Sequence, residues 1–108
     1  MYLPSQIVSS KLTNAAATYY TSLVNARTII QNATLCNTTV GSVTVTVYLV
    51  PAGGTAGTAN EIFTRSIATL ATDRCPELVG KVLNENGSLQ AVGLNVTFDV
   101  SALIFLHN

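Results

Sequence analysis

The chain has 108 residues, the size of a single domain, and its five basic and five acidic residues give a formal net charge of zero. Charged residues make up 9% of it and hydrophobic residues 48%. So few scattered cations exclude a nucleic-acid-binding surface, and the longest strongly apolar run, 102–106, is far shorter than the roughly 20 residues of a membrane-spanning helix. The first residues lack the basic and then apolar pattern of a secretory signal.

The first half of the chain is rich in Thr and Val and predicts β-strands. Short strands are expected over 6–12 and 18–23, followed by a strand over 27–39 with Ile29, Ala33 and Leu35 on one face. Residues 43–49 alternate strictly between apolar and polar and end at Pro51, so they predict the clearest strand. The turn at 39–42 predicts that these last two strands form an antiparallel hairpin.

The second half begins with a glycine-rich segment, 51–60, which lacks the Lys-Ser/Thr pair of a phosphate-binding loop and is expected to be a plain connection. A strand is predicted over 61–69. Residues 77–83 favour one or two helical turns, and the turn signal at 84–87 precedes a short strand at 88–92.

The C-terminal segment changes its pattern along its length. Leu94, Val96, Phe98 and Val100 alternate with polar residues, which is typical of a half-buried strand, but residues 102–106 are apolar on both faces. A strand buried on both sides lies either in the middle of a sandwich or in a subunit interface. The predicted contact with another subunit or partner therefore consists of Leu103, Ile104, Phe105 and Leu106.

Together these elements predict an all-β fold, a single antiparallel β-sandwich of about seven to eight short strands with at most one short helix near 77–83. Residues 1–108 are expected to form one domain, whose N-terminal and C-terminal segments contact neighbouring subunits.

Residues for catalysis are scarce, and no catalytic, cofactor-binding or metal-binding site is predicted. His107 is the only histidine, and Cys36, Cys75 and His107 lack the paired spacing of metal ligands. The five carboxylates favour solvated or ion-paired roles. Free, buried thiols are favoured for the two cysteines, and a disulfide between them stays an open alternative.

Several segments, taken in their order along the chain, resemble a family of small virion-associated structural proteins of tailed bacteriophages. They are residues 15–21, 28–34, 37–39, 43–51 and 75–83 with the turn at Gly87, so the resemblance covers roughly residues 12–92. None of these segments is a catalytic signature. The resemblance implies a β-sandwich of the decoration or cement type, or of the neck or tail accessory type, with no enzymatic residues to carry over.

The expected function is that of a non-enzymatic phage structural protein without cofactors, most simply a capsid decoration or cement protein that binds and stabilises the assembled particle. Its expected partners are copies of itself in a homotrimer and the major capsid protein, with no nucleic acid and no membrane. Its expected location is the virion, assembled in the bacterial host cytoplasm. The alternatives are a neck, collar or tail/fibre-associated protein, or a module that binds the host surface through loops such as 51–60. The chain has no Trp for stacking on a glycan, which ranks the last alternative lower.

Overall fold

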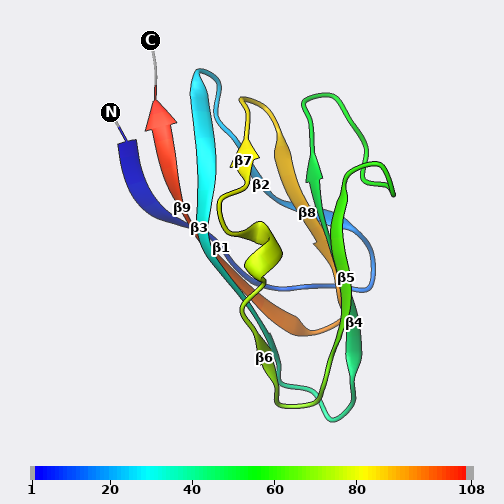
Figure 1. The fold of residues 1–108 in the computed structure, drawn as a ribbon. Coiled ribbons are helices and arrows are strands. Elements are labelled where there is room, and N and C mark those ends of the chain that lie inside the picture. Colours follow the sequence, from blue (N-terminus) through cyan, green and yellow to red (C-terminus); the bar gives the residue numbers. More distant parts are fainter. Residues whose placement is uncertain (1, 107–108) are drawn as a thin grey trace.

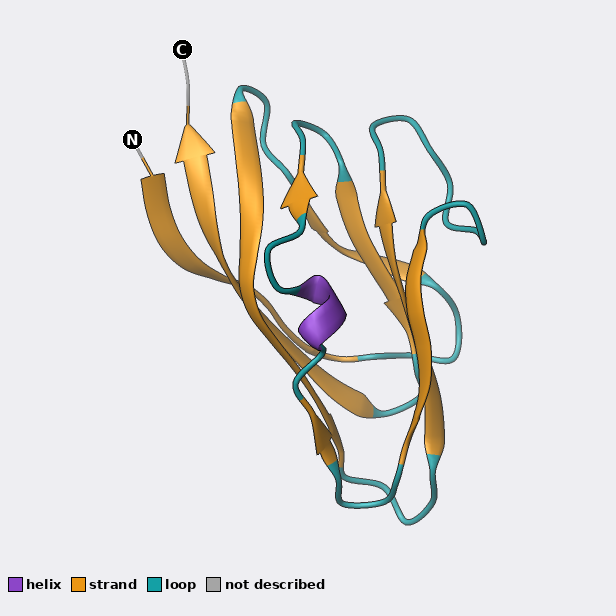
Figure 2. Cartoon of the chain, viewed as in Figure 1, coloured by secondary structure: helices purple, strands orange, loops and turns teal. Residues whose placement is uncertain are grey.

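The computed structural model describes the backbone of residues 2–106 and the side chains of residues 4–105. In this range nine β-strands and one short 3-10 helix form two antiparallel sheets packed face to face (Figures 1 and 2). The elements are β1 (Tyr2–Lys11), β2 (Ala17–Thr21), β3 (Ala26–Asn37), β4 (Val43–Val50), β5 (Glu61–Ile67), β6 (Thr72–Asp73), η1 (Pro76–Leu78), β7 (Val82–Leu83), β8 (Ser88–Val92) and β9 (Val96–Leu106). The predicted antiparallel β-sandwich is confirmed.

The order of the strands gives the sandwich its topology. One sheet runs β1-β9-β3-β6, with β7 also paired to β3, and the other runs β2-β8-β4-β5. Most connections cross from one sheet to the other, and β6 and β7 occupy one interrupted strand position beside β3. Eight strand positions connected in this way form a jelly roll. Because β1 and β9 are paired neighbours, the first and last strands lie side by side (Figure 1).

The core lies between the two sheets, where alternate residues of each long strand point inward. Leu35, Val45, Val47, Phe98 and Val100 are all buried there, and Phe98 is the largest side chain among the fully buried residues. The turn before β9 closes tightly on this core. A Cβ atom at Gly93 would meet Val45 Cγ2 at 2.7 Å, so only a glycine fits without movement of the core.

The hairpin predicted between residues 27–39 and 43–49 is wrong. The two strands exist as β3 and β4, but they belong to opposite sheets, and residues 38–42 cross from one to the other. The buried amide of Asn37 fixes this crossing: Nδ2 donates to the carbonyl oxygens of Gly41 at 2.9 Å and Ile67 at 2.8 Å, and Oδ1 accepts from the Thr39 backbone at 2.9 Å. The turn residues are therefore tied to the end of β5 instead of to a β3–β4 ladder.

The face predicted for Ile29 is also wrong. The pairing of β3 with β9 shifts between Ile30 and Asn32, which marks a β-bulge. An extra residue reverses the phase of the inward-facing positions. Ala33 and Leu35 share one face, as predicted, and it points into the core, but on the other side of the bulge Ile30 is buried and Ile29 lies half-buried on the outer face.

Two further boundaries differ from the predictions. The helical turn is limited to η1, because Gly80 N donates to Ile30 O at 2.7 Å and Ile30 N donates to Lys81 O at 2.9 Å, which draws the following residues onto β3 as β7. The last strand begins at Val96, since Asn95 adopts a left-handed conformation with φ 63° and Leu94 is exposed in the preceding turn.

Candidate assembly surface

The outer face of the β1-β9-β3 sheet changes character along its length. Near the turn before β9, its outward positions are polar, as in Thr97 and Asp99, and Gln6 Nε2 donates to Asp99 Oδ1 at 2.9 Å. Towards the two chain ends the outward positions become apolar. Four strands contribute one residue each to a continuous row, since Pro4 is paired with Leu103, Leu103 with Ile29, and Ile29 with Val82.

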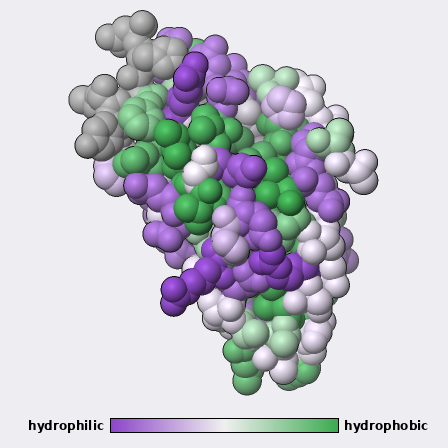
Figure 3. All heavy atoms as spheres, viewed as in Figure 1, coloured by the Kyte–Doolittle hydropathy of each residue, from purple (hydrophilic) through white to green (hydrophobic). Residues whose placement is uncertain are grey.

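Phe105 adds to this row from the next outward position of β9, opposite Arg27 of β3. We call Pro4, Ile29, Val82, Leu103 and Phe105 the apolar stripe. Val82 is 47% exposed and Phe105 36%, while Ile29 and Leu103 are half-buried by their neighbours. Figure 3 shows hydrophobic atoms gathered over the upper part of β3 and β7, with hydrophilic atoms below them.

The surface is hollowed at the stripe. Arg27, Ile29, Val82 and Phe105 line a groove of about 520 Å³. A second hollow, of about 270 Å³, adjoins it and is lined by Ala26, Arg27, Asn84 and Glu85. Apolar side chains therefore line most of the groove, and Arg27 lines both hollows, the second of which also includes the acidic Glu85.

The structure divides the four residues of the predicted contact between two faces. Leu103 and Phe105 point outward and belong to the apolar stripe. Ile104 is buried on the inner face, like Ala102 two residues before it in β9. The side chain of Leu106 lies outside the described residues. A contact through Leu103 and Phe105 stays a prediction.

Sequence reasoning missed Ile29 and Val82 as surface residues. Ile29 was expected to share a face with Ala33 and Leu35, and Val82 was expected in a helical turn. Their position beside Leu103 depends on the bulge in β3 and on the pairing of β7 with β3, two features that arise from contacts distant in the sequence. The only local signal is the β-branched pair Ile29-Ile30, which offers an apolar side chain to each face of a strand.

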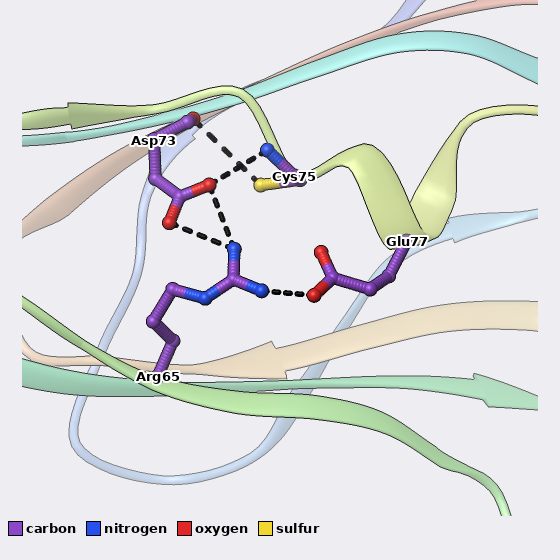
Figure 4. A network of polar contacts seen from close by, with 4 residues as sticks. All are labelled: Arg65, Asp73, Cys75 and Glu77. Atoms are coloured by element: carbon purple, nitrogen blue, oxygen red, sulfur yellow. Dashed lines mark hydrogen bonds and ion pairs between the residues drawn. The ribbon is translucent and has the colours of Figure 1, made fainter.

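A network of ionic and polar contacts joins the two sheets at another place (Figure 4). Arg65 Nη1 of β5 lies 2.9 and 2.8 Å from the two carboxylate oxygens of Asp73 in β6, and Arg65 Nη2 bonds Glu77 Oε2 of η1. The Cys75 backbone N–H donates to Asp73 Oδ1 at 2.8 Å. Burial raises the pKa of Asp73, but the hydrogen bonds from Cys75 and Arg65 outweigh it and leave this pKa below its ordinary value.

This network, which we call the Arg65 brace, is suited to holding the sheets together and offers no reactive nucleophile. Cys75 is buried, and burial, reinforced by the negative charge of Asp73, raises the pKa of its thiol to about 12. A thiol with this pKa is almost wholly protonated near neutral pH and is a poor nucleophile. Asp73 and Glu77 are ion-paired, which is one of the two roles, solvated or ion-paired, that the sequence favoured for the carboxylates.

The remaining candidates for chemistry lie apart. Both cysteines are free, with Cys36 half-buried on the outer face of β3, paired with Thr97 and Thr72. Within the described part of the chain no three side chains of the metal-binding types come together. His107 is outside that part. The described helix is also too short to cross a membrane.

The glycine-rich segment 51–60 is a loop, as predicted. Its first residues and the β7–β8 turn border a hollow of about 210 Å³, lined by Leu49–Ala52, Val82–Glu85 and Gly87. No aromatic side chain lines it, so it lacks the stacking surface that a glycan site commonly uses.

Comparisons with known proteins give a match at the level of the fold. No protein-family model matches the sequence, and no curated protein matches it. A chain of the Bacillus endospore appendages, which form a family of disulfide-linked pili, is similar in structure with a TM-score of 0.55 and 14% identity, over 99% of this chain and 89% of that chain.

Two chains from infectious bursal disease virus, one from a viral particle and one from a VP2 subviral particle, give TM-scores of 0.41 and 0.40 at 13% and 12% identity. They are matched over 99% of this chain but over only 31% and 33% of their own length. At these identities the likeness to the appendage chain shows a shared fold, and the relation to tailed-phage proteins stays a prediction.

Proposed function

We propose that this chain is a non-enzymatic structural protein that works in many copies within a larger protein assembly. The apolar stripe is the observation that carries the proposal. A β-sandwich that functions alone covers its outer sheet faces with polar residues, and contiguous apolar surface on such a face indicates an interaction site. The low charge of the chain fits the same role, because little charge is needed on a surface that neighbours cover.

In its specific form, the proposal is that the chain is a capsid decoration or cement protein of a tailed bacteriophage, bound to the major capsid protein of the virion. The ordered segments that resemble virion-associated proteins support it. The pairing of β1 with β9 also supports it, since the first and last strands both contribute to the apolar stripe and can therefore reach one neighbour.

The test compares particles with and without the protein. A protein that binds only the assembled particle stabilises it by about 2.7 kcal/mol per site at a hundredfold excess over the dissociation constant. Particles that lack it should therefore still assemble, but release their DNA at a lower temperature. An unchanged release temperature, with the protein found only at the tail tip by imaging, would reject decoration and favour the host-binding alternative.

A second candidate function is that of a repeating unit in a pilus-like appendage. The fold shared with the Bacillus endospore appendage chain favours it, because the likeness spans nearly the whole of both chains. Electron microscopy of the purified protein distinguishes the two candidates. An appendage unit forms filaments on its own, whereas a decoration protein forms no filaments and is arranged in a repeating array only on the particle.

A further inference from the structure

We propose that the apolar stripe is the contact between two copies of this chain, packed stripe against stripe about a two-fold axis. This inference rests on the proposed function as a self-associating structural protein and names the surface and the partner. A two-fold contact uses the same patch on both subunits, so the patch must complement itself in shape and in charge.

The shape of the stripe meets the first condition. Its row crosses four paired strands, which at the usual spacing extends over roughly 14 Å. Phe105 forms one wall of the groove, and Ile29 and Val82 lie along it. A two-fold rotation can place Phe105 of each copy against the groove of the other. An aromatic residue near the centre of a contact and covered on all sides is the usual source of binding energy.

The charges around the stripe meet the second condition. Arg27 lines the groove and Lys81 precedes Val82, while Glu85 lines the adjoining hollow together with Arg27. All three residues are exposed. Among the described residues none of the three forms an ion pair, since the only ion pairs there belong to the Arg65 brace.

A partner with charges of one sign would match either Arg27 and Lys81 or Glu85, but not all three. A second copy brings both signs and places its own Glu85 opposite Arg27, and the zero net charge of the chain adds no repulsion between copies. The two-fold contact differs from the homotrimer expected from the sequence, because a ring of three needs two different complementary surfaces on each subunit.

The first experiment compares Val82→Asp with Leu94→Asp by sedimentation equilibrium, and circular dichroism checks that both variants fold. The two side chains are similarly exposed, at 47% and 51%, but Leu94 lies outside the stripe. The wild-type chain is expected to be a dimer at micromolar concentration. Val82→Asp should raise the dissociation constant by roughly tenfold or more, because it buries a charge in the apolar contact, and Leu94→Asp should leave it unchanged.

The second experiment tests the charge pairing. Arg27→Glu and Glu85→Arg should each weaken the dimer, and the double variant should restore it, because the opposite signs face each other again across the axis. Glu85 Oε2 also accepts a hydrogen bond from the Asn25 backbone at 2.6 Å, so thermal unfolding of each single variant is measured alongside its association. A double variant no better than the singles would overturn the pairing of these two residues.

The outcomes separate this inference from the proposed function. The two-fold stripe contact is overturned if Val82→Asp self-associates as strongly as the wild-type chain, or if the wild-type chain has the mass of a trimer or a monomer. Particle binding is then judged by its own test. A stripe-dependent dimer that joins neither particles nor filaments upholds the contact and rejects the proposed function.

Discussion

The two halves of β9 run through the same sheet but meet different surroundings. In the first half Val96, Phe98 and Val100 point into the core, and the residues between them are polar. In the second half the inward positions stay apolar, and the outward positions are taken by Leu103 and Phe105. Both halves have β1 on one side and β3 on the other.

A place in the middle of the sheet therefore does not explain why Leu103 and Phe105 are apolar. The first half of β9 also lies between β1 and β3, and its outward residues are polar. What differs is the chemistry of the outer face, which is polar at Thr97 and Asp99 and apolar at Leu103 and Phe105. The comparison teaches that the outer face of one strand can change from polar to apolar without a change of neighbouring strands, which supports the proposed contact over the second half, and the experiments below test each half separately.

The largest expected effect separates the two phenylalanines of β9. Phe98→Ala should destabilise the chain by about 3–5 kcal/mol, because it leaves a cavity in a fully buried site. Phe105→Ala should cost no more than about 1 kcal/mol in the monomer, since its ring is on the outer face, but should weaken association of the copies. Urea unfolding at low protein concentration measures the first quantity and sedimentation the second. Equal losses of stability would show that Phe105, like Phe98, mainly stabilises the fold of the monomer, which would contradict the contrast between the two halves.

Gly93→Ala should destabilise the chain by about 1–3 kcal/mol, because the added methyl group meets Val45 Cγ2 at 2.7 Å and forces the core to move. Gly41→Ala is a matched control, since a Cβ at Gly41 has no atom within 4 Å. The midpoint of thermal unfolding measures both. A control as unstable as Gly93→Ala would mean that backbone conformation decides the effect instead of packing.

A smaller effect is expected from the Arg65 brace, which fastens the sheets beside the first half of β9 only. Asp73→Asn should cost roughly 1 kcal/mol near neutral pH, because the pair is partly exposed and solvent screens it. The folded pKa of Asp73 lies below its ordinary value, so the stabilisation is complete above that ordinary value and is lost as the pH falls through the lower, folded pKa. Unfolding measured from neutral to acidic pH should show the wild type converging on the variant in acid, and a constant difference would contradict the brace.

Much of the fold could be predicted from the sequence, because strands with one buried face repeat every second residue. The β-sandwich class and the strand at 43–49 follow directly from this local pattern. The partner of each strand does not, and the hairpin predicted from the turn at 39–42 was wrong because the buried amide of Asn37 links that turn to β5. Such a link joins residues 30 positions apart and leaves no periodic signal.

The candidate site was also predictable only where it depends on the local pattern of one strand. Leu103 and Phe105 stand out within one strand, whereas Ile29 and Val82 join them only through the bulge in β3 and the pairing of β7. A bulge changes which face a residue occupies without changing the composition of the strand. The pattern therefore predicted which residues of β3 share a face after Gln31, but not which residues share that face before it.

The smallest expected effect is one of reactivity, and it tests whether the polar part of the outer face stays open when copies associate. Cys36 lies outward on β3 opposite Thr97 of the first half of β9, away from the apolar stripe. A thiol reagent at neutral pH should label it in the native protein. Cys75 should react only in denaturant, because it is buried and the pKa of its thiol is about 12. Cys36→Ser should therefore remove all native labelling.

Labelling of Cys36 should proceed at the same rate in the wild-type chain and in Val82→Asp, since a contact confined to the stripe leaves Cys36 uncovered in both. Mass spectrometry of samples quenched over time measures the rate at each cysteine. Protection of Cys36 in the associated protein alone would mean that the second copy also covers the polar part of the sheet. The distinction between the two halves of β9 would then reflect two kinds of contact within one interface instead of a covered and an open surface.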